Sequence, residues 1–457
     1  MAAPAPDGGL AGWGKVGSMM VVQASTIGLQ YAFGILFVVL LEAFPGHGRA
    51  AVSWVGALST GVLEIAAVLA GVVSSATSVR FCVFIGSLLT WLGLFLSSFA
   101  TELWHLYLTF GVLVGLGHAL CFPAGMIVVN GWFTKRRALA NGVGTTGVGV
   151  GTLIFGPLTK LLVEALGWRA TFRVLSLSAA SAILAGLNYT SREEVGEGCS
   201  LRWLTHPRGH VKTAAAAVAS KLNGANATPG GTDAPSGEAA EQAATTTDVR
   251  GVSAVAQMLR MPRMRRFVVG QFIWGWGFWI APIHAPRFAQ DMGHPASAVA
   301  TLVSCIGLGS LCGRIPITAL ADALGRTRVY IGVLCVYGTA TAALCLATEE
   351  TALGLWMVYA VVAGACCGSL MALSGPVAVE ALALPDPKLV MISSTAAFSC
   401  MGTGVMFGPP VAGFLFDRRG DYFLSFALAS AMIWAGALVL MTPERLWGRV
   451  EAATPNP

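Results

Sequence analysis

The chain has 457 residues, of which 11 % are charged and 55 % are hydrophobic, and its mean hydropathy is +0.71. Soluble domains carry roughly 25 % charged residues, because their surfaces must stay hydrated. The composition therefore excludes a nucleic-acid-binding module, a disordered chain and a cytosolic enzyme. It indicates an integral membrane protein. In such a protein the net charge of +6 matters less than the positions of the charged residues along the chain, which indicate the orientation in the membrane.

Long apolar segments follow one another along the chain. A membrane-spanning helix needs roughly 20 apolar residues, and the sequence divides into segments of that length. The first set lies near 15–41, 52–73, 80–99, 103–128, 138–162 and 170–189, and the second near 266–288, 297–320, 327–347, 352–378, 390–416 and 422–441. We therefore predict an all-α membrane protein with twelve transmembrane helices in two six-helix halves.

A polar segment separates the two sets. Residues 190–265 are rich in Ala, Gly, Thr and Ser and contain little to bury, which predicts a largely disordered cytoplasmic linker. The predicted organisation is a cytoplasmic N-terminus (1–14), an N-terminal six-helix bundle (15–189), the linker (190–265), a C-terminal six-helix bundle (266–441) and a short cytoplasmic tail (442–457).

The placement of Lys and Arg predicts the orientation. With the N-terminus inside, the cytoplasmic segments apart from the linker hold Lys15, Arg80, Lys135, Arg136, Arg137, Arg326, Arg328, Lys388, Arg445 and Arg449, and the outer turns hold Arg49, Arg169, Arg287, Arg418 and Arg419. Both termini are thus predicted to be cytoplasmic, in a multi-pass protein that we expect in the plasma membrane. The arginines at 260, 263, 265 and 266 precede the seventh span; a topology signal is the main interpretation and a lipid site the alternative.

Small residues recur at helix-packing spacing. Gly147 with Gly151, Gly111 with Gly115, and Gly364 with Gly368 all have the GxxxG spacing that lets membrane helices approach closely. The fifth span also contains a GxGxxG pattern that begins at Gly142. A basic loop precedes it instead of a strand, which argues against a dinucleotide site.

Charges inside apolar segments are candidates for function, because their burial is costly. Arg314 lies well inside the eighth span, where its guanidinium can bind a carboxylate bidentately. A structural ion pair with a carboxylate on another helix is the equal alternative. Glu64 lies in the middle of the second span and either pairs with such an arginine, carries a proton, or packs as a neutral side chain. His118 and His284 are interpreted as hydrogen-bonded packing residues.

No metal or cofactor site is predicted. Most of the ten cysteines lie inside apolar segments, no CxxC occurs, and no histidine clusters with them. HExxH, GxSxG and paired carboxylates at a span mouth are also absent from the sequence, so we do not expect an enzyme. Nucleic acid is not an expected partner.

The turn between the eighth and ninth spans carries an acid and two arginines around a glycine. In Ala319-Leu320-Ala321-Asp322-Ala323-Leu324-Gly325-Arg326-Thr327-Arg328, Asp322 and Arg326 can latch two helices together at the cytoplasmic face. This segment resembles the major facilitator signature between paired helices.

Two further segments resemble signatures of the monocarboxylate-transporter family. PDGGLAGWGKV precedes the first span, and WFTKRRALANGVGTTG leads into the fifth, where Phe133, Lys135, Arg136, Arg137, Leu139, Ala140, Asn141 and Gly142 match in order. GWRATF and FGPPVAGFLFD are also similar to that family. The resemblance implies a twelve-helix major facilitator fold and alternating access, with movement of small organic anions that is often coupled to protons.

The sequence departs from the family at residues linked to coupling. Tyr31, Ala32 and Phe33 match a first-span run, but Gly34 and Ile35 follow, so the family's lysine is missing. Ser310 stands where members have an aspartate, four residues before Arg314. Ala363, Ala365 and Cys367 replace bulky aromatic residues of the tenth span. We therefore expect altered coupling or a larger substrate.

The predicted function is secondary active transport of a monocarboxylate-like anion. In the expected mechanism Arg314 holds the substrate carboxylate, with Tyr31 and Ser310 lining the cavity. Lys135 and Arg136 are assigned to the cytoplasmic gate, Asp322 and Arg326 to the latch, and Glu64 to substitute proton transfer. Alternatives are an exchanger of the oxalate–formate type and a transporter-like sensor that moves no solute. Membrane lipids are expected partners, whereas the sequence does not identify an accessory membrane glycoprotein.

Overall fold

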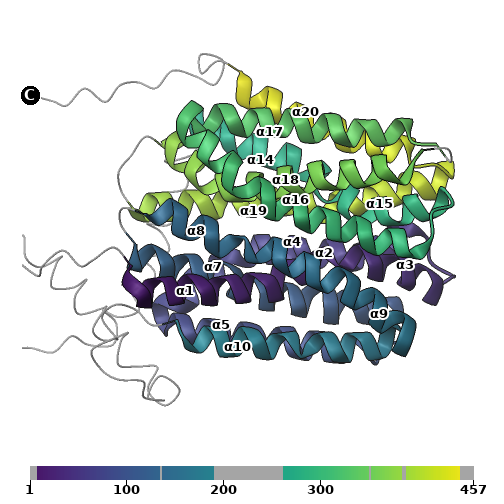
Figure 1. Cartoon of the computed structure of the whole chain (residues 1–457), viewed down its shortest axis with the longest axis horizontal. Coiled ribbons are helices and arrows are strands. Elements are labelled where there is room, and N and C mark those ends of the chain that lie inside the picture. The colour runs from purple at the N-terminus through teal and green to yellow at the C-terminus, as the bar shows by residue number, and fades with distance from the viewer. Residues whose placement is uncertain (1–7, 134–135, 190–260, 349–350, 383–386, 443–457) are drawn as a thin grey trace, which may run out of the picture.

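The computed structural model describes residues 8–133, 136–189, 261–348, 351–382 and 387–442. Within these ranges the chain forms helices and no strand. The helices run along the long axis of the molecule, with the N-terminal half (α1–α10) beside the C-terminal half (α14–α20), as Figure 1 shows.

The N-terminal half contains six passes along this axis. In chain order its helices are α1 (Gly9–Gln23), the π-helical turn η1 (Ala24–Gly28), α2 (Leu29–Tyr31), α3 (Phe33–Ala43), α4 (Arg49–Ala76), α5 (Val79–Ser97), α6 (Leu103–Leu106), the π-helical turn η2 (Tyr107–Val114), α7 (Gly115–Trp132), α8 (Arg137–Thr145), α9 (Gly147–Ser176) and α10 (Ser178–Leu187). The chain turns back inside α9 at Gly167, where φ is 75° and ψ is 165°. Only glycine reaches this conformation without strain, so the fifth pass ends there and the sixth begins.

The C-terminal half repeats the arrangement. Its helices are α14 (Pro262–Phe278), α15 (Ile280–Asp291), α16 (Ala296–Leu324), α17 (Arg326–Ala343), the 3₁₀ turn η4 (Leu344–Leu346), α18 (Leu353–Leu382), α19 (Pro387–Arg419) and α20 (Phe423–Met441). Pro262 is the first residue of α14, a position that tolerates proline because the amide has no helical partner there.

Twelve passes result within the described residues, as the sequence predicts. Ten segments of the described chain have the length and hydropathy of a membrane span. One of them, Leu139–Leu187, has 49 residues and crosses twice because of Gly167. The pair α14–α15 adds a further pass, although arginines in its first turns lower its hydropathy.

Two helices begin earlier than predicted. α1 begins at Gly9 rather than at residue 15, and α14 begins at Pro262 rather than at residue 266. Hydropathy places these boundaries too late, because both first turns are polar or glycine-rich. The predicted linker up to residue 260 and the tail from residue 443 lie outside the described residues.

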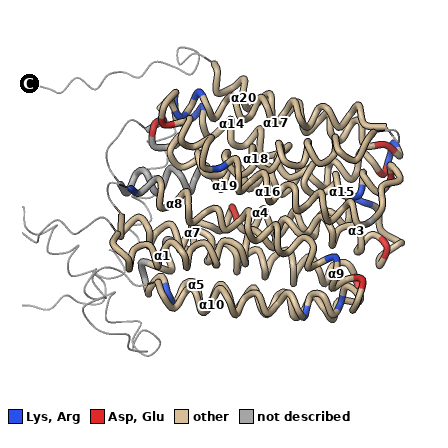
Figure 2. Tube along the Cα trace, in the orientation of Figure 1, with Lys and Arg blue, Asp and Glu red and all other residues tan. Residues whose placement is uncertain are grey.

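Charged residues gather at the two ends of the bundle (Figure 2). We call one of them the linker end, where the chain leaves at 189, returns at 261 and turns at 325. The other is the far end, which holds the turns at 44–48, 98–102, 167, 292–295 and 420–422. The halves meet where α4 packs on α19, α9 on α16 and α3 on α15.

The predicted glycine contacts are confirmed. A β-carbon at Gly147 would collide with the backbone of Met20, and one at Gly151 with the backbone of Ala24. Gly364 packs in the same way on the backbone of Ile306. The close approach of these helices therefore depends on the absence of side chains, as GxxxG packing requires.

Candidate functional site

The first pass is irregular halfway along its length. The π-helical turn η1 precedes α2, and the helix is interrupted again at Ala32, whose amide donates to the Leu29 carbonyl at 3.0 Å. This tighter bond replaces the regular α-helical pattern. Tyr31 directly precedes the interruption, so its side chain leaves the helix at the irregular turn.

The seventh pass is interrupted at Trp279, between α14 and α15. Pro282 has no amide hydrogen, so it cannot donate to the carbonyl of Phe278 one turn earlier. The hydroxyl of Tyr337 donates to that carbonyl instead, at 2.7 Å. The proline therefore opens the helix, and a tyrosine on α17 satisfies the released oxygen.

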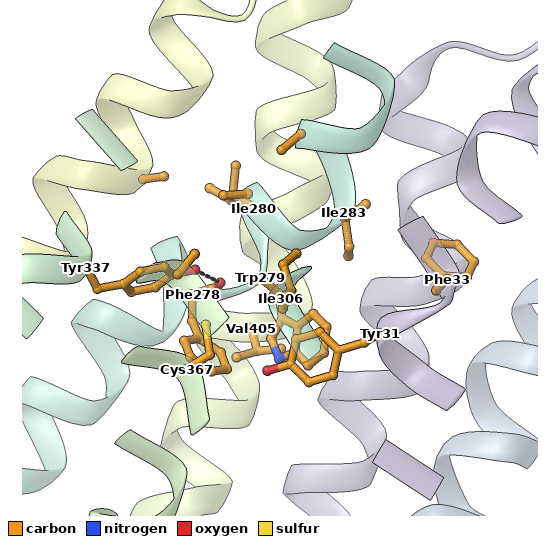
Figure 3. Close-up of a cluster of buried hydrophobic side chains, with 14 of the residues drawn as sticks. Tyr31, Phe33, Phe278, Trp279, Ile280, Ile283, Ile306, Tyr337, Cys367 and Val405 are labelled. Atoms are coloured by element: carbon orange, nitrogen blue, oxygen red, sulfur yellow. Dashed lines mark hydrogen bonds between the residues drawn. The ribbon is translucent and has the colours of Figure 1, made fainter. Parts of the chain in front are cut away.

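The two interruptions face each other across the interface between the halves. The rings of Tyr31 and Trp279 have centroids 4.6 Å apart, and both side chains are buried. The Tyr31 hydroxyl points to the side of Cys367 (Figure 3). The buried Nε1 of Trp279 has no hydrogen-bond partner among the described residues. Interrupted helices at corresponding positions of two repeats mark the substrate site in many transporters.

Arg314 links the two halves beside this contact. Its Nη1 donates to the carbonyl of Thr145 at 2.5 Å, and its Nη2 donates to Ser310 Oγ at 3.2 Å. Thr145 ends α8, where the fifth pass is interrupted before α9. Arg314 as a whole residue is 3 % exposed, and its Nε has no partner in the described ranges.

The alternative of a structural ion pair for Arg314 finds no support in the described chain, where no carboxylate pairs with it. The oxygens that it meets are neutral. Gly368 on α18 makes room for it, since a β-carbon there would lie 2.6 Å from Ser310 Oγ and 3.2 Å from Arg314 Nε. The arrangement is a buried cation that can accept an anion.

Glu64 lies in a different part of the same interface. Its side chain on α4 is 5 % exposed, and a β-carbon at Gly402 on α19 would lie 2.7 Å from its Cβ. Its Oε2 has no hydrogen-bond partner among the residues described. Nearby, Ser399 Oγ donates to the Ile65 carbonyl at 3.3 Å. A titratable group thus lies where α4 and α19 must separate if the halves move.

Three of the predicted gating residues, Arg136, Asp322 and Arg326, lie at the linker end. Arg326 Nε is 3.0 Å from Asp322 Oδ1, so the predicted latch pair is in contact, within the C-terminal half. Arg136 is exposed directly before α8. Lys135 lies outside the described residues.

The far end is closed by polar contacts between the halves. Arg49, the first residue of α4, places Nη1 2.6 Å from Asp291 Oδ2 and 2.7 Å from the Tyr422 hydroxyl. Its guanidinium also lies 3.5 Å from the centre of the Phe416 ring. The carboxylate of Asp417 accepts the backbone amides of Arg49 and Ala50 at 2.8 and 2.9 Å. All these partners of α4 belong to the C-terminal half.

The two buried histidines differ. His284 Nε2 is 2.9 Å from the Pro409 carbonyl, as a packing histidine requires. The prediction is wrong for His118, because neither of its ring nitrogens has a hydrogen-bond partner in the described ranges. The apolar surroundings of α7 that favour its burial offer it no acceptor.

Sequence reasoning missed two parts of the central site and the cation of the far-end closure. Thr145 contributes a backbone oxygen, which leaves no mark in the sequence. Trp279 was not singled out, although Pro282 three residues later is a signal for an interrupted helix. Arg49 was assigned only to the outer turns, and its partners become evident only in three dimensions.

The comparisons with known proteins agree with this architecture. The model of the Major Facilitator Superfamily matches residues 19–310 and 267–453. A solved POT family transporter in complex with a thioalcohol conjugated peptide has the same fold, with a TM-score of 0.65, 12 % identity and coverage of 95 % of this chain and 96 % of that one. The chain therefore belongs to the Major Facilitator Superfamily, whose members are multi-pass membrane transporters.

Curated relatives refine the assignment. The chain is 28 % identical to Monocarboxylate transporter 13 of Rattus norvegicus, over 99 % of this chain and 93 % of the relative. It is 27 % identical to Monocarboxylate transporter 11 of Mus musculus, over 95 % and 88 %. Monocarboxylate transporter 12 of Homo sapiens is 39 % identical over 37 % of this chain and 33 % of that protein. The predicted membership of a monocarboxylate-transporter-like group is confirmed.

Proposed function

We propose that this transporter moves a small organic anion of the monocarboxylate type. The observation that carries the proposal is Arg314, a buried guanidinium between the halves that meets only neutral oxygens among the described residues. A buried cation without an anion is costly, and a carboxylate matches the fork of a guanidinium. The names of the relatives support the same substrate class.

Substrate binding in this proposal acts on the contact between the halves. A carboxylate that binds Arg314 replaces the Thr145 carbonyl, and the link between α16 and α8 is released. Tyr31 and Ser310 line the space on either side, and Trp279 offers a hydrogen-bond donor. The two six-helix halves then rock about this centre, which gives alternating access.

The linker end is proposed to face the cytoplasm, with both termini, in the plasma membrane. The excess of Lys and Arg in the turns of this end supports the orientation. Lys135 and Arg136 then act at the cytoplasmic gate, and Asp322 with Arg326 holds the turn between α16 and α17. In this orientation the far end, closed by Arg49, faces outward.

The direct test is uptake into proteoliposomes that contain the purified full chain. We expect radiolabelled small monocarboxylates to accumulate faster than into empty vesicles, and their uncharged amides to be excluded. Preloading the vesicles with unlabelled carboxylate separates exchange, in which uptake is stimulated, from symport. Equal uptake of carboxylates and amides would contradict an anion site at Arg314.

Glu64 is proposed to carry the coupled proton in place of the missing family residues at Ile35 and Ser310. We expect Glu64→Gln to leave uptake insensitive to an imposed pH gradient, because glutamine keeps the shape but cannot exchange a proton. Initial rates with and without the gradient are the measurement. Glu42→Gln is the matched control, since Glu42 is an exposed partner of Arg287 at the far end. A gradient response that persists in Glu64→Gln excludes this role.

Arg49 is expected to keep the far end closed. Arg49→Gln removes the charge next to Asp291, so the central cysteine Cys367 becomes more reactive toward an impermeant thiol reagent added from the far-end side. We expect the labelling rate of Cys367 to rise about threefold or more, because the loss of a partly exposed ion pair destabilises the closed far end by about 0.7 kcal/mol or more. The labelling uses a background in which the other cysteines are serine. Arg419→Gln, which removes an exposed charge outside the network, leaves the rate unchanged. An unaltered rate in Arg49→Gln contradicts the closure.

A further inference from the structure

A cavity of about 530 Å³ opens at the linker end of the C-terminal half, away from the centre. It lies between the first turns of α14 and α17 and the last turns of α18 and α20. None of its lining residues belongs to the central site or to the far-end closure. The transport proposal therefore leaves this cavity unexplained.

Three guanidinium groups line the cavity. Arg263 and Arg266 project from the start of α14, and Arg328 from the start of α17. Arg263 and Arg328 are exposed, whereas Arg266 is half-buried and its Nη1 donates to the Thr442 carbonyl at 2.5 Å. Two separate helices thus bring three positive charges to one cavity, with Arg266 held in place by the end of α20.

Glu380 is the one carboxylate among the described lining residues. Its Oε2 accepts hydrogen bonds from the amide of Thr327 at 3.3 Å and from the hydroxyl of Thr327 at 3.1 Å. The carboxylate therefore stabilises the first turn of α17. Among the described lining residues, three guanidinium groups accompany this one carboxylate. Multiply charged anions are the ligands that a cluster of guanidinium groups attracts.

The wall of the cavity is apolar beneath the arginines. Phe267, Leu324, Val377 and Leu440 contribute it. A free inorganic anion does not use such a surface, whereas an amphiphile places its charge on the arginines and its hydrocarbon on the apolar side chains. The cavity also lies at the ends of the membrane helices, the level of lipid headgroups.

We propose that this arginine cavity, lined by Arg263, Arg266 and Arg328, binds a phosphate-bearing anion, and that a phosphorylated lipid headgroup is its ligand. The guanidinium forks bind the phosphate oxygens, and the apolar wall receives the first part of an acyl chain. The proposal does not depend on the identity of the transported substrate.

The experiment measures binding to the purified full chain in neutral-lipid nanodiscs. The probes are a fluorescent short-chain phosphatidylinositol bisphosphate, the soluble inositol trisphosphate and inorganic phosphate. We compare the unaltered chain with Arg263→Gln/Arg328→Gln, in which the two exposed arginines of the cavity are replaced while Arg266 keeps its contact with the end of α20. Arg418→Gln/Arg419→Gln removes two exposed arginines at the far end and is the matched control.

We expect the cavity variant to bind the lipid at least about tenfold more weakly, as the loss of two charge-assisted contacts implies, and the control to bind it as the unaltered chain does. Tighter binding of the lipid than of inositol trisphosphate supports the lipid as ligand. Equal binding of the two, with the same loss in the cavity variant, supports a soluble phosphate ester and overturns the lipid assignment. Unchanged lipid binding in the cavity variant, or an equal loss in the control, overturns the site.

Discussion

Arg314→Gln is expected to lower the initial rate of carboxylate uptake by about 100-fold or more. Two charge-assisted hydrogen bonds to a carboxylate contribute about 1.5–3 kcal/mol each, and 1.4 kcal/mol corresponds to a factor of ten. The shorter glutamine also gives up the bond of Nη1 to the Thr145 carbonyl, so the amount of folded protein is measured beside uptake. Uptake per molecule of reconstituted transporter is the measurement.

Two further variants separate charge from geometry at this position. Arg314→Lys keeps the charge but lacks the planar fork, so we expect uptake between that of Arg314→Gln and the unaltered chain. Ser310→Ala removes one neutral partner and is expected to reduce uptake only a few-fold. Normal uptake by Arg314→Gln, at an unchanged amount of folded protein, would contradict the carboxylate role.

Gly147→Ala is expected to lower the free energy of unfolding by about 1–3 kcal/mol. The added methyl group would overlap the backbone of Met20, which cannot move as a side-chain end can. Either the helices α9 and α1 separate or their backbones distort, and both weaken the N-terminal half. The temperature at which the detergent-solubilised protein loses its monodisperse elution peak reports the change.

Gly142→Ala is the control within the same glycine-rich run. A β-carbon at Gly142 meets nothing within 4 Å, and alanine is favoured over glycine inside a helix by about 0.5–1 kcal/mol. We therefore expect Gly142→Ala to keep or raise the unfolding temperature. An equal loss in both variants would indicate that helix flexibility, and not close packing, explains the glycines.

The helices could be predicted because each long apolar segment must bury its backbone polar groups in a membrane. The glycine spacing likewise specified Gly147 and Gly364 as contact points, since small residues leave a direct mark in the sequence. The boundaries at Gly9 and Pro262 could not be predicted by hydropathy, because these helices continue beyond the apolar segment into polar turns.

The position of candidate residues between the halves could be predicted where the chemistry belongs to side chains. Arg314, Ser310 and Tyr31 lie at the interface between the halves, as expected for residues that line a path between them. The acceptor at Thr145 is a main-chain oxygen that becomes available because α8 ends there. Its role cannot be predicted from the sequence, because every residue type has the same main-chain oxygen. The pairing of Tyr31 with Trp279 depends on two helix interruptions facing each other, which is a property of the tertiary arrangement.

Asp417 closes the far end by capping a helix that belongs to the other half. Its carboxylate takes the amides of Arg49 and Ala50, and these are main-chain groups that every residue type except proline supplies. When the far end opens, water replaces the carboxylate at these amides, and losing a helix cap costs about 0.5–2 kcal/mol. This part of the closure is therefore independent of the side chain at position 49 and weak enough for thermal motion to reverse it.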